Sequence, residues 1–422
     1  MKLKYISAGL LSLSLLTGCE KDKGPQGSGE MEKLSPKESV AFIEKTAGGV
    51  LSLLNPADQS EIIELAAYYT VNYGDYTLPA SWIEGGLTSR GFNPGNYITS
   101  LSMAAEGNIT GITRAAMSIT PGMIIEKLSG IYTPDEATHS WVKSSDSKDI
   151  VFSFSNAAQA PVELRIVRTG DEWIDLSATL TENGAELAQS NVKGNFDEKK
   201  HTLTADATVS VMNLRGHVDV AGRDSEVKSN TSLFISDKRV ADSYATVYGN
   251  GLCDPSRWKE LSNIENVLLD NLIGKMIKDA DCGLDILGEV QVYGQAKYYE
   301  QFLLDIAGAY TVAPGSDSRE AEEASRKACD RLNKNVKAQL RFNRTKTNQA
   351  TLLFSPKEKV FELSKEYVAY PMIRFNDGSV YSPEECLAAM SDMAAPLQAL
   401  IGAYVTIWKE SLVKAEMSKT AQ

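Results

Sequence analysis

The chain has 422 residues, with 43 Lys and Arg against 55 Asp and Glu, so its formal net charge is −12. A surface of that sign repels phosphate backbones and anionic head groups, which argues against a nucleic-acid-binding protein. The apolar share of 43% is ordinary for a globular protein, and the length suffices for two or three domains or for one large body.

The N-terminus carries the pattern of a bacterial export signal. Lys2 and Lys4 precede an apolar run at residues 6–16, and the tetrapeptide Leu16-Thr17-Gly18-Cys19 closes the segment. This run is too short to cross a bilayer core of about 30 Å as a permanent helix, so residues 1–18 are predicted to be a cleaved signal peptide. The segment resembles the lipobox of bacterial lipoproteins. That resemblance implies that Cys19 receives a diacylglyceryl group and becomes the acylated first residue of the mature protein.

Residues 19–33 are predicted to form a flexible tether, because they are polar, rich in Gly and poor in side chains that can pack. The folded body is expected to begin near residue 34, and no later apolar run is expected to cross a membrane. Several acyl chains on one terminus anchor a protein durably. We therefore expect a lipid-anchored protein of the cell envelope. Glu20 in place of Asp favours the outer membrane, by resemblance to lipoprotein sorting rules, and leaves the membrane face open.

Four further cysteines remain after Cys19, an even number in an exported protein, and four cysteines allow three disulfide pairings. A bridge between Cys253 and Cys282 needs a break in the helix predicted between them, because a straight helix of about 24 residues is about 36 Å long. Cys329 and Cys386 lie in helical patterns and can meet across a helix pair. The alternative is that all four are small buried apolar side chains.

Residues 34–148 are predicted to form an N-terminal helical region. Apolar residues recur at spacings of three and four over residues 36–54 and 58–69, which is typical of amphipathic helices, and further helices are predicted at 97–105 and 122–128. Ser/Thr-Pro-x-Glu tetrads also predict helix starts, because the hydroxyl caps the first turn, Pro fits the first helical position and Glu returns a bond to the cap. These tetrads begin at Ser35, Thr133, Ser355 and Ser382, and similar starts are predicted at Asn55-Pro56 and Asp254-Pro255.

Residues 149–251 are predicted to form an antiparallel β-meander of seven to eight strands. Apolar and polar residues alternate there with a period of two, as over residues 162–167 and 202–211. Turn signals recur about every ten residues, and Asn183-Gly184 is the strongest because both residues accept the positive φ of a tight hairpin turn. The predicted fold class is therefore α+β, a meander covered by N- and C-terminal helices.

Residues 252–422 are predicted to form a helical region with added strands that pack on the sheet. Helices are expected at residues 255–278, 296–310 and 316–340, and a last long helix at 383–417 is expected to kink or break at Pro396. Strands are expected at 284–293, 351–354 and 370–375, with a turn at residues 376–379.

The chain carries few residue patterns for catalysis. Its three histidines, His139, His201 and His217, lie in different strand or loop contexts without a second metal ligand at the usual spacing, although His217 and Asp219 share a strand face. Nucleophile elbows, zinc motifs and phosphate loops are absent from the sequence. Ser-x-x-Lys occurs three times without companion motifs, which indicates chance. These pairs are Ser145/Lys148, Ser225/Lys228 and Ser411/Lys414.

Three weaker hypotheses concern acids and aromatic rings. Asp171, Glu172 and Asp175 include the carboxylate pairs that a glycosidase needs, but they sit at a hairpin turn where acids are common. The alternating acids of residues 279–285 resemble the opening of a calcium loop, but Leu284 and Val290 stand where Gly and Glu are expected. Trp82, Trp141 and Trp173 lie beside polar or Gly-rich segments, where a ring either stacks on a sugar or closes a core.

The lipobox, short tether, capped helices, long meander and late turn at residues 376–383 together resemble large Bacteroidetes-type lipoproteins, a lipobox lipoprotein family of unknown function. The resemblance carries over no catalytic residue, metal or cofactor. We expect a non-enzymatic, membrane-anchored protein that binds a lipid, a glycan or an envelope partner. The alternatives are a structural or assembly lipoprotein of an envelope complex and, third, a polymer hydrolase.

Overall fold

The computed structural model describes residues 29–79, 97–101, 128–170, 174–254, 256, 276–313, 315–361 and 364–421. Within them, one 17-stranded and mostly antiparallel sheet dominates, accompanied by helices. The α+β class is confirmed, and the prediction of seven to eight strands undercounts the sheet. The helices are α2 (Pro36–Leu51), η1 (Pro56–Gln59), α3 (Ser60–Tyr73), α10 (Tyr299–Ala307), α11 (Arg319–Asn335), α12 (Pro383–Ala389) and α13 (Ser391–Ala421).

The strands follow the chain in a long meander. The first ten are β1 (Gly130–Asp135), β2 (Ser140–Ser145), β3 (Ile150–Ser155), β4 (Pro161–Arg168), β5 (Ile174–Glu182), β6 (Ala185–Asp197), β7 (Thr202–Val211), β8 (Leu214–Arg223), β9 (Glu226–Ile235) and β10 (Lys238–Gly249). The remaining seven are β11 (Ile277–Ile286), β12 (Val290–Lys297), β13 (Ala309–Val312), β14 (Val336–Phe342), β15 (Ala350–Val360), β16 (Lys365–Phe375) and β17 (Val380–Tyr381).

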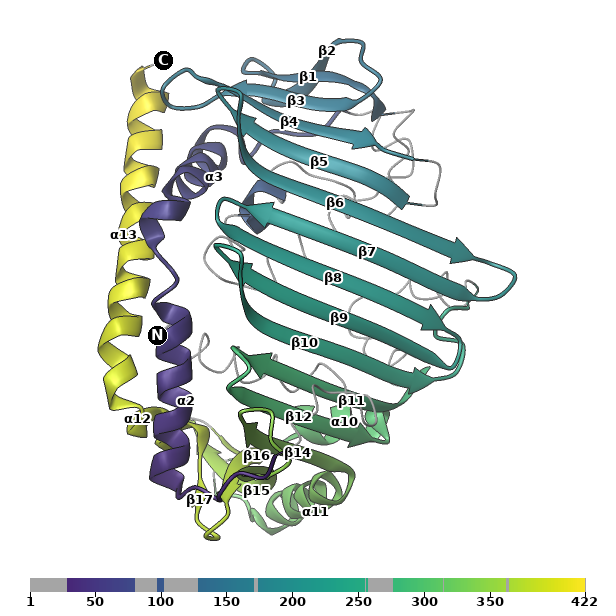
Figure 1. Cartoon of the computed structure of the whole chain (residues 1–422), viewed down its shortest axis with the longest axis vertical. Helices are drawn as coiled ribbons and strands as arrows, with labels where there is room; N and C mark the ends of the chain where they lie inside the picture. The colour runs from purple at the N-terminus through teal and green to yellow at the C-terminus, as the bar shows by residue number, and fades with distance from the viewer. Residues whose placement is uncertain are drawn as a thin grey trace.

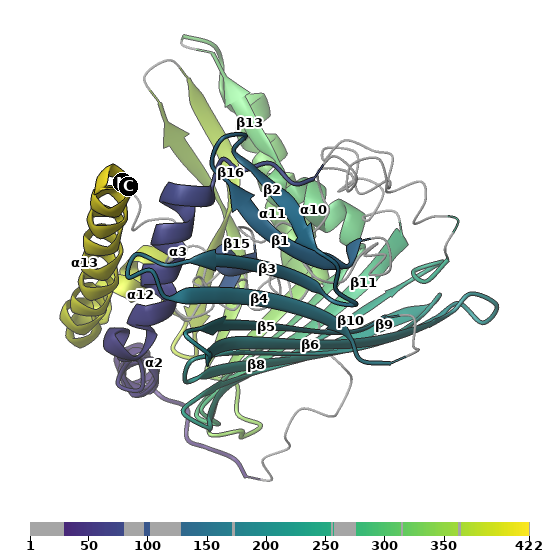
Figure 2. The ribbon, with the colours of Figure 1, turned by 90° about the horizontal axis from the view of Figure 1, so that it is seen from above.

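Strand pairing is almost entirely between neighbours in sequence. β1 lies between β2 and β3 and is parallel to β3, and the antiparallel ladder then runs from β3 to β12 and on through β14, β15 and β16. Both β13 and β17 pair with the remaining edge of β16. Figure 1 shows the strands stacked from β2 at the top to β15 and β16 at the bottom, and Figure 2 shows that the sheet twists, so that β15 and β16 point in a different direction from β3 and β4.

The main core lies between α3 and the apolar face of the meander. Every second residue of β3, β4 and β5 faces inward, so Phe152, Leu164 and Ala178 are fully buried. On the helix side, Ile62 and Ile63 are also fully buried and belong to the same cluster. The period of two predicted for residues 149–251 therefore arises from a sheet with one dry and one wet face.

Two smaller clusters lie at the other end of the sheet. Phe302 of α10 and Leu332 of α11 pack against Ala296 of β12 and Phe354 of β15. In the other cluster, Val40 of α2 packs with residues of β15, β16 and α12. The described helices thus cover the two ends of the sheet.

Helix α13 runs along the side of the molecule, next to α2 and then α3 (Figure 1). Tyr404 donates a hydrogen bond to Gln59 Oε1 at 3.1 Å, and Lys414 pairs with Glu64 at 3.2 Å. Among the described residues, no single helix is long and apolar enough to cross a membrane, whereas α12 and α13 reach that length and composition only as a pair bent by 92°.

Several sequence predictions of helices are wrong. The predicted helical region 34–148 contains strands β1 and β2, and the tetrads at Thr133 and Ser355 lie within β1 and β15. The tetrads at Ser35 and Ser382 are confirmed, since each forms a complete capping box. The last helix breaks at Met390, and Pro396 lies inside α13. The helix predicted over 316–340 ends at residue 335, where β14 begins.

Two further segments differ from the prediction. The strand expected at 284–293 is a hairpin of β11 and β12, turned by Leu287 and Gly288, which both have positive φ. The helix expected at 255–278 lies mostly outside the described residues, and its last two positions belong to β11. The prediction is confirmed at the Asn183-Gly184 turn, where both residues have positive φ.

Residues 29–33, which belong to the predicted tether, and Leu34 are bound to the β14–β15 connection, while residues 19–28 lie outside the described residues. Four hydrogen bonds form this clasp: Lys346 N to Gly29 O (3.3 Å), Met31 N to Thr347 Oγ1 (2.9 Å), Leu34 N to Gln349 Oε1 (2.9 Å) and Gln349 Nε2 to Glu32 O (3.0 Å). Gln349 is fully buried. The clasp therefore fixes where the N-terminal segment leaves the body.

Candidate binding groove between α2 and α13

A groove of about 730 Å³ lies between α2 and the first half of α13. Its volume falls within the range of about 300–1,000 Å³ that is usual for small-molecule sites. The lining side chains are mostly small or apolar: Ala41, Glu44, Lys45, Gly48, Leu51, Ser52, Leu54 and Pro56 from the N-terminal side, and Asp392, Met393, Pro396, Ala399, Leu400 and Ala403 from α13.

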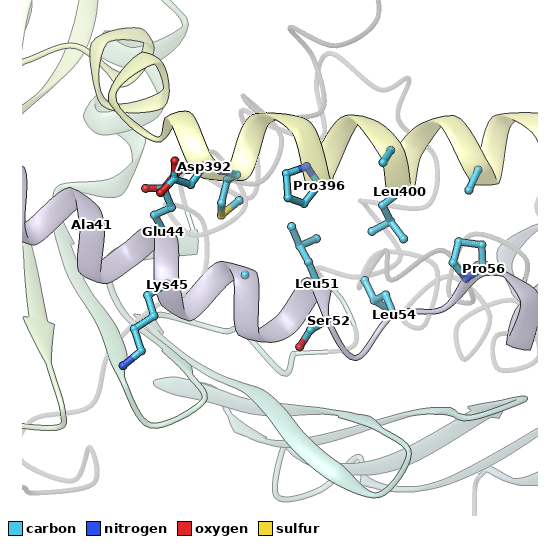
Figure 3. Close-up of a pocket in the computed structure, with 14 residues that line it drawn as sticks. Ala41, Glu44, Lys45, Leu51, Ser52, Leu54, Pro56, Asp392, Pro396 and Leu400 are labelled. Atoms are coloured by element: carbon cyan, nitrogen blue, oxygen red, sulfur yellow. Dashed lines mark hydrogen bonds between the residues drawn. The ribbon is translucent and has the colours of Figure 1, made fainter.

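The local sequence explains why the two helices leave this space. Gly48 has no side chain, and a Cβ atom built on it would meet no atom within 4 Å. Pro396, Ala399 and Ala403 line the groove with short side chains from α13. Figure 3 shows Leu51 and Leu54 pointing toward Pro396 and Leu400, so apolar carbon lines the middle of the groove.

One end of the groove is polar. Glu44 Oε1 accepts a hydrogen bond from the backbone N–H of Met393 at 2.8 Å, which satisfies one amide of the exposed first turn of α13. Asp392 and Lys45 also line the groove, and Figure 3 shows the Lys45 side chain extending from the side of α2 that lies away from α13. The site therefore offers an apolar channel whose charged residues are two carboxylates and one lysine, a net negative charge that suits a chain whose head is neutral or cationic.

Sequence reasoning missed this groove. The sequence predicted a lipid, glycan or envelope partner as ligand without assigning a site, and the groove lies between two helices far apart in the sequence. The sequence held one signal of this groove, because residues 393–408 form a run of 16 residues without a charge. In the structure, this part of α13 is exposed or half-exposed throughout. An uncharged but exposed helix face is a mark of a binding surface.

The three histidines lie apart, and each pairs with one aspartate. His139 Nδ1 lies 3.1 Å from Asp75, and His217 Nε2 lies 2.6 Å from Asp206. His201 Nδ1 lies 2.7 Å from Asp224, and this hydrogen bond raises the pKa of His201. Among the described residues, the hydrogen-bond partner of each histidine is thus an aspartate carboxylate and not the Ser hydroxyl or Cys thiol that a catalytic triad needs.

The Ser-x-x-Lys pairs also have structural explanations. Ser411 is buried and donates its hydroxyl hydrogen to Ile407 O within α13 at 2.6 Å, while Lys414 pairs with Glu64. Ser145 and Lys148 are exposed on and after β2. Ser225 lies in the turn before β9, where Lys228 lies 3.6 Å from Glu226.

The acids of residues 279–285 lie on the continuous strand β11 and are occupied individually. Asp281 accepts from Gln295 at 2.8 Å, and Asp285 pairs with Arg344 at 2.7 Å. Within the described part of the chain, no group of three or more His, Cys, Asp or Glu side chains is placed to hold a metal ion. Asp175 is likewise engaged, because it accepts a hydrogen bond from Thr169, while Asp171 and Glu172 lie outside the described residues.

The four cysteines, Cys253, Cys282, Cys329 and Cys386, are buried and no disulfide joins them among the described residues, which favours the alternative of small buried apolar side chains. They lie on different elements: Cys253 packs beside Gly222 of β8, and Cys282 beside Gly294 of β12. Burial raises the pKa of Cys386 to about 11. A thiol of that kind is inert at neutral pH.

The remaining predicted residues separate into two groups. Trp141 is 1% exposed and packs edge-on against Phe152 with ring centroids 5.0 Å apart, so it closes the core and offers no sugar platform. Trp82, Trp173 and the predicted acylation site Cys19 lie outside the described residues.

No protein-family model, curated protein or solved structure matches this chain.

Proposed function

We propose that this protein is a lipid-anchored, non-enzymatic binding protein of the bacterial cell envelope, tethered to the outer membrane through Cys19. It holds one apolar chain of a lipid in the groove between α2 and α13. The observation that carries the proposal is the groove itself, with its apolar middle and its pair of carboxylates at one end. Acylation of Cys19 supplies the membrane anchor.

The charge at the polar end selects among lipids. The groove is lined by two acids, Glu44 and Asp392, and one base, Lys45, so its net charge is negative and disfavours a free fatty-acid carboxylate or a bare phosphate. A neutral head, or one that carries an amine, meets no such repulsion. The proposed ligand class is therefore an acyl chain with a neutral or amine-bearing head group.

The clasp keeps the groove close to the proposed anchor. Ten peptide steps separate Cys19 from Gly29, which reach at most about 33–36 Å. Helix α2 starts at Pro36, just after the last clasp residue Leu34, and the groove begins at Ala41 on that helix. A protein anchored in this way keeps its groove within reach of the bilayer surface.

Two experiments test the proposal. Metabolic labelling with a fatty-acid probe should label the wild-type protein and leave Cys19→Ala dark, and equal labelling of both would remove the anchor. For the groove, a photoactivatable amine-headed lipid with one acyl chain should cross-link to peptides from α2 and α13. Cross-links that map only to other elements would remove the lipid site.

A second candidate function, glycan binding, rests on a row of residues on the face of the sheet turned away from the main core, where Gly283 is buried and Tyr244 and Tyr293 are half-buried. Asp219, Asn230, Tyr244, Gly283 and Tyr293 stand directly opposite one another across strands β8 to β12. A Cβ atom on Gly283 would lie 2.2–2.6 Å from ring atoms of Tyr244, so that ring extends across β11. Tyrosine rings beside amides and carboxylates suit a neutral sugar.

Affinity electrophoresis in gels that contain neutral polysaccharides tests this second function. Retardation of the wild-type protein that disappears in Tyr244→Ala supports it. Equal migration of the two proteins in every such gel removes it.

A further inference from the structure

The β15–β16 hairpin projects from the body as a finger. Eleven residue pairs join the two strands, and β13 adds a third strand along residues 365–368. Residues 357–360 of β15 are exposed on both faces of the strand, so no described residue covers this end. A hydrogen bond from Phe361 N to Ser364 O at 2.8 Å closes the hairpin.

The described tip of this finger is apolar. Val360 is 69% exposed, the largest value among the exposed large hydrophobic side chains of the described residues, and the adjacent Phe361 is 50% exposed. Two neighbouring apolar side chains at the end of a projecting hairpin are unfavourable in water, at about 25 cal/mol per Å² of apolar surface. Their position favours a contact with an apolar phase.

Lysines and glutamates alternate next to these two side chains on both strands. Lys359 is exposed next to Val360, and Lys365, directly opposite Val360, pairs with Glu358 at 2.9 Å. Lys357 lies over the ring of Tyr370 at 3.6 Å. Lysine stems extend along an apolar surface and place their ammonium groups at the level of lipid phosphates.

The length of the N-terminal segment matches the reach of the finger. The clasp holds Gly29 beside Lys346, four residues before β15 begins, and β15 then runs ten peptide steps from Ala350 to Val360, about 33 Å. The ten steps from Cys19 to Gly29 span at most about 33–36 Å. A lipid on Cys19 and the finger tip can therefore reach the same bilayer with the finger pointing toward it.

We infer that Val360 and Phe361 insert into the interfacial region of the bilayer to which Cys19 is anchored, and so form a second membrane contact that orients the body. This inference rests on the proposed membrane anchoring. Peripheral apolar groups insert about 5–10 Å. The four exposed residues of β15 are long enough for that depth while the body stays in water.

The test uses the full acylated protein reconstituted in phosphatidylcholine vesicles. Phe361→Trp should show a blue-shifted emission relative to the wild-type spectrum and at least twofold stronger quenching by lipids that carry bromine on their acyl chains. Val413→Trp serves as the matched control, because Val413 is 55% exposed on α13. Quenching of Phe361→Trp no greater than that of Val413→Trp overturns the inference.

Mass spectrometry of the same preparation separates the two proposals. If Cys19 carries no acyl group, the anchor fails, while quenching of Phe361→Trp with added vesicles still supports the finger contact. If Cys19 is acylated and Phe361→Trp is not quenched, the anchor stands and the finger contact is overturned. Circular dichroism that matches the wild-type spectrum shows that each variant is folded.

Discussion

Replacement of Gly48 by phenylalanine should close the groove without unfolding the protein. A Cβ atom at this position meets no other atom within 4 Å, so the new side chain has space to enter the groove. Gly in a helix interior destabilises by about 0.5–1 kcal/mol relative to Ala. The urea midpoint of Gly48→Phe should therefore equal or exceed that of the wild-type protein.

The expected loss of lipid affinity follows from the methylene groups that the new side chain displaces. A phenyl ring with its Cβ takes the place of about four methylenes of a bound chain, and each buried methylene contributes about 0.8 kcal/mol. The affinity should fall by about 3 kcal/mol, which is about a hundredfold in Kd. Gly48→Ala displaces one methylene and should weaken binding about fourfold, so the two variants form a graded pair.

Displacement of a fluorescent single-chain amine lipid measures these affinities. Gly402→Phe is the matched control, because Gly402 is also a helical glycine with no atom within 4 Å of an added Cβ, and it does not line the groove. It should bind as the wild-type protein does. Wild-type affinity in Gly48→Phe, with the fold intact, would refute the assignment of the groove as the lipid site.

Three further predictions concern the fold. Thiol reagents should leave all four buried cysteines unmodified in the native protein and titrate four thiols after denaturation without reductant; fewer than four would reveal a disulfide. Asp305→Asn should lower the free energy of unfolding in urea by about 2–3 kcal/mol, because the carboxylate of Asp305 is 3% exposed and accepts two hydrogen bonds from Arg331. This loss is smaller than that expected when one partner of a fully buried ion pair is removed, because Arg331 is 42% exposed. A loss below about 0.5 kcal/mol would contradict this, since that is the scale of an exposed pair. The hydrogen bond to Asp224 raises the pKa of His201 in the folded state. The stability difference between the wild-type protein and His201→Gln should therefore be largest below the ordinary histidine pKa of about 6.5 and should vanish as the pH rises through the raised pKa. A stability difference that does not depend on pH would contradict this prediction.

The Ser/Thr-Pro-x-Glu tetrads predicted a helix start correctly only where the tertiary structure does not place the same residues in a strand. Ser35 and Ser382 form the predicted capping boxes. The same tetrad at Thr133 lies in β1, whose residues pair with β2 and β3, and the tetrad at Ser355 lies in β15, paired along its whole length with β16. A cap contributes about 1 kcal/mol, which a strand ladder with buried side chains exceeds.

The α11–β14 boundary shows how a helical spacing can hide a strand. Leu332, Val336 and Leu340 are four residues apart, and a separation of four places residues on one face of a helix and also on one face of a strand. In the structure, Leu332 ends the buried stripe of α11, while Val336 and Leu340 belong to β14. β-Branching at Val336 favours the strand.

The groove was beyond sequence reasoning for a different reason. Its walls come from residues about 350 positions apart, and the contact that sets one end joins Glu44 to Met393. Glycine, alanine and proline at such positions carry no chemical signature of a ligand. Only the juxtaposition of two helices, which depends on the docking of α13 against α3 through Tyr404 and Trp408, creates the space.

A membrane anchor also constrains how a groove of this kind selects its ligand. Moving an acyl chain from the bilayer core into an apolar groove exchanges one dry environment for another, so the hydrophobic effect that favours uptake from water contributes little there. Discrimination must then come from the head group, where Glu44 and Asp392 lie. The affinity measured in water and the occupancy at the membrane are therefore different quantities, and the carboxylate end of the groove determines the second.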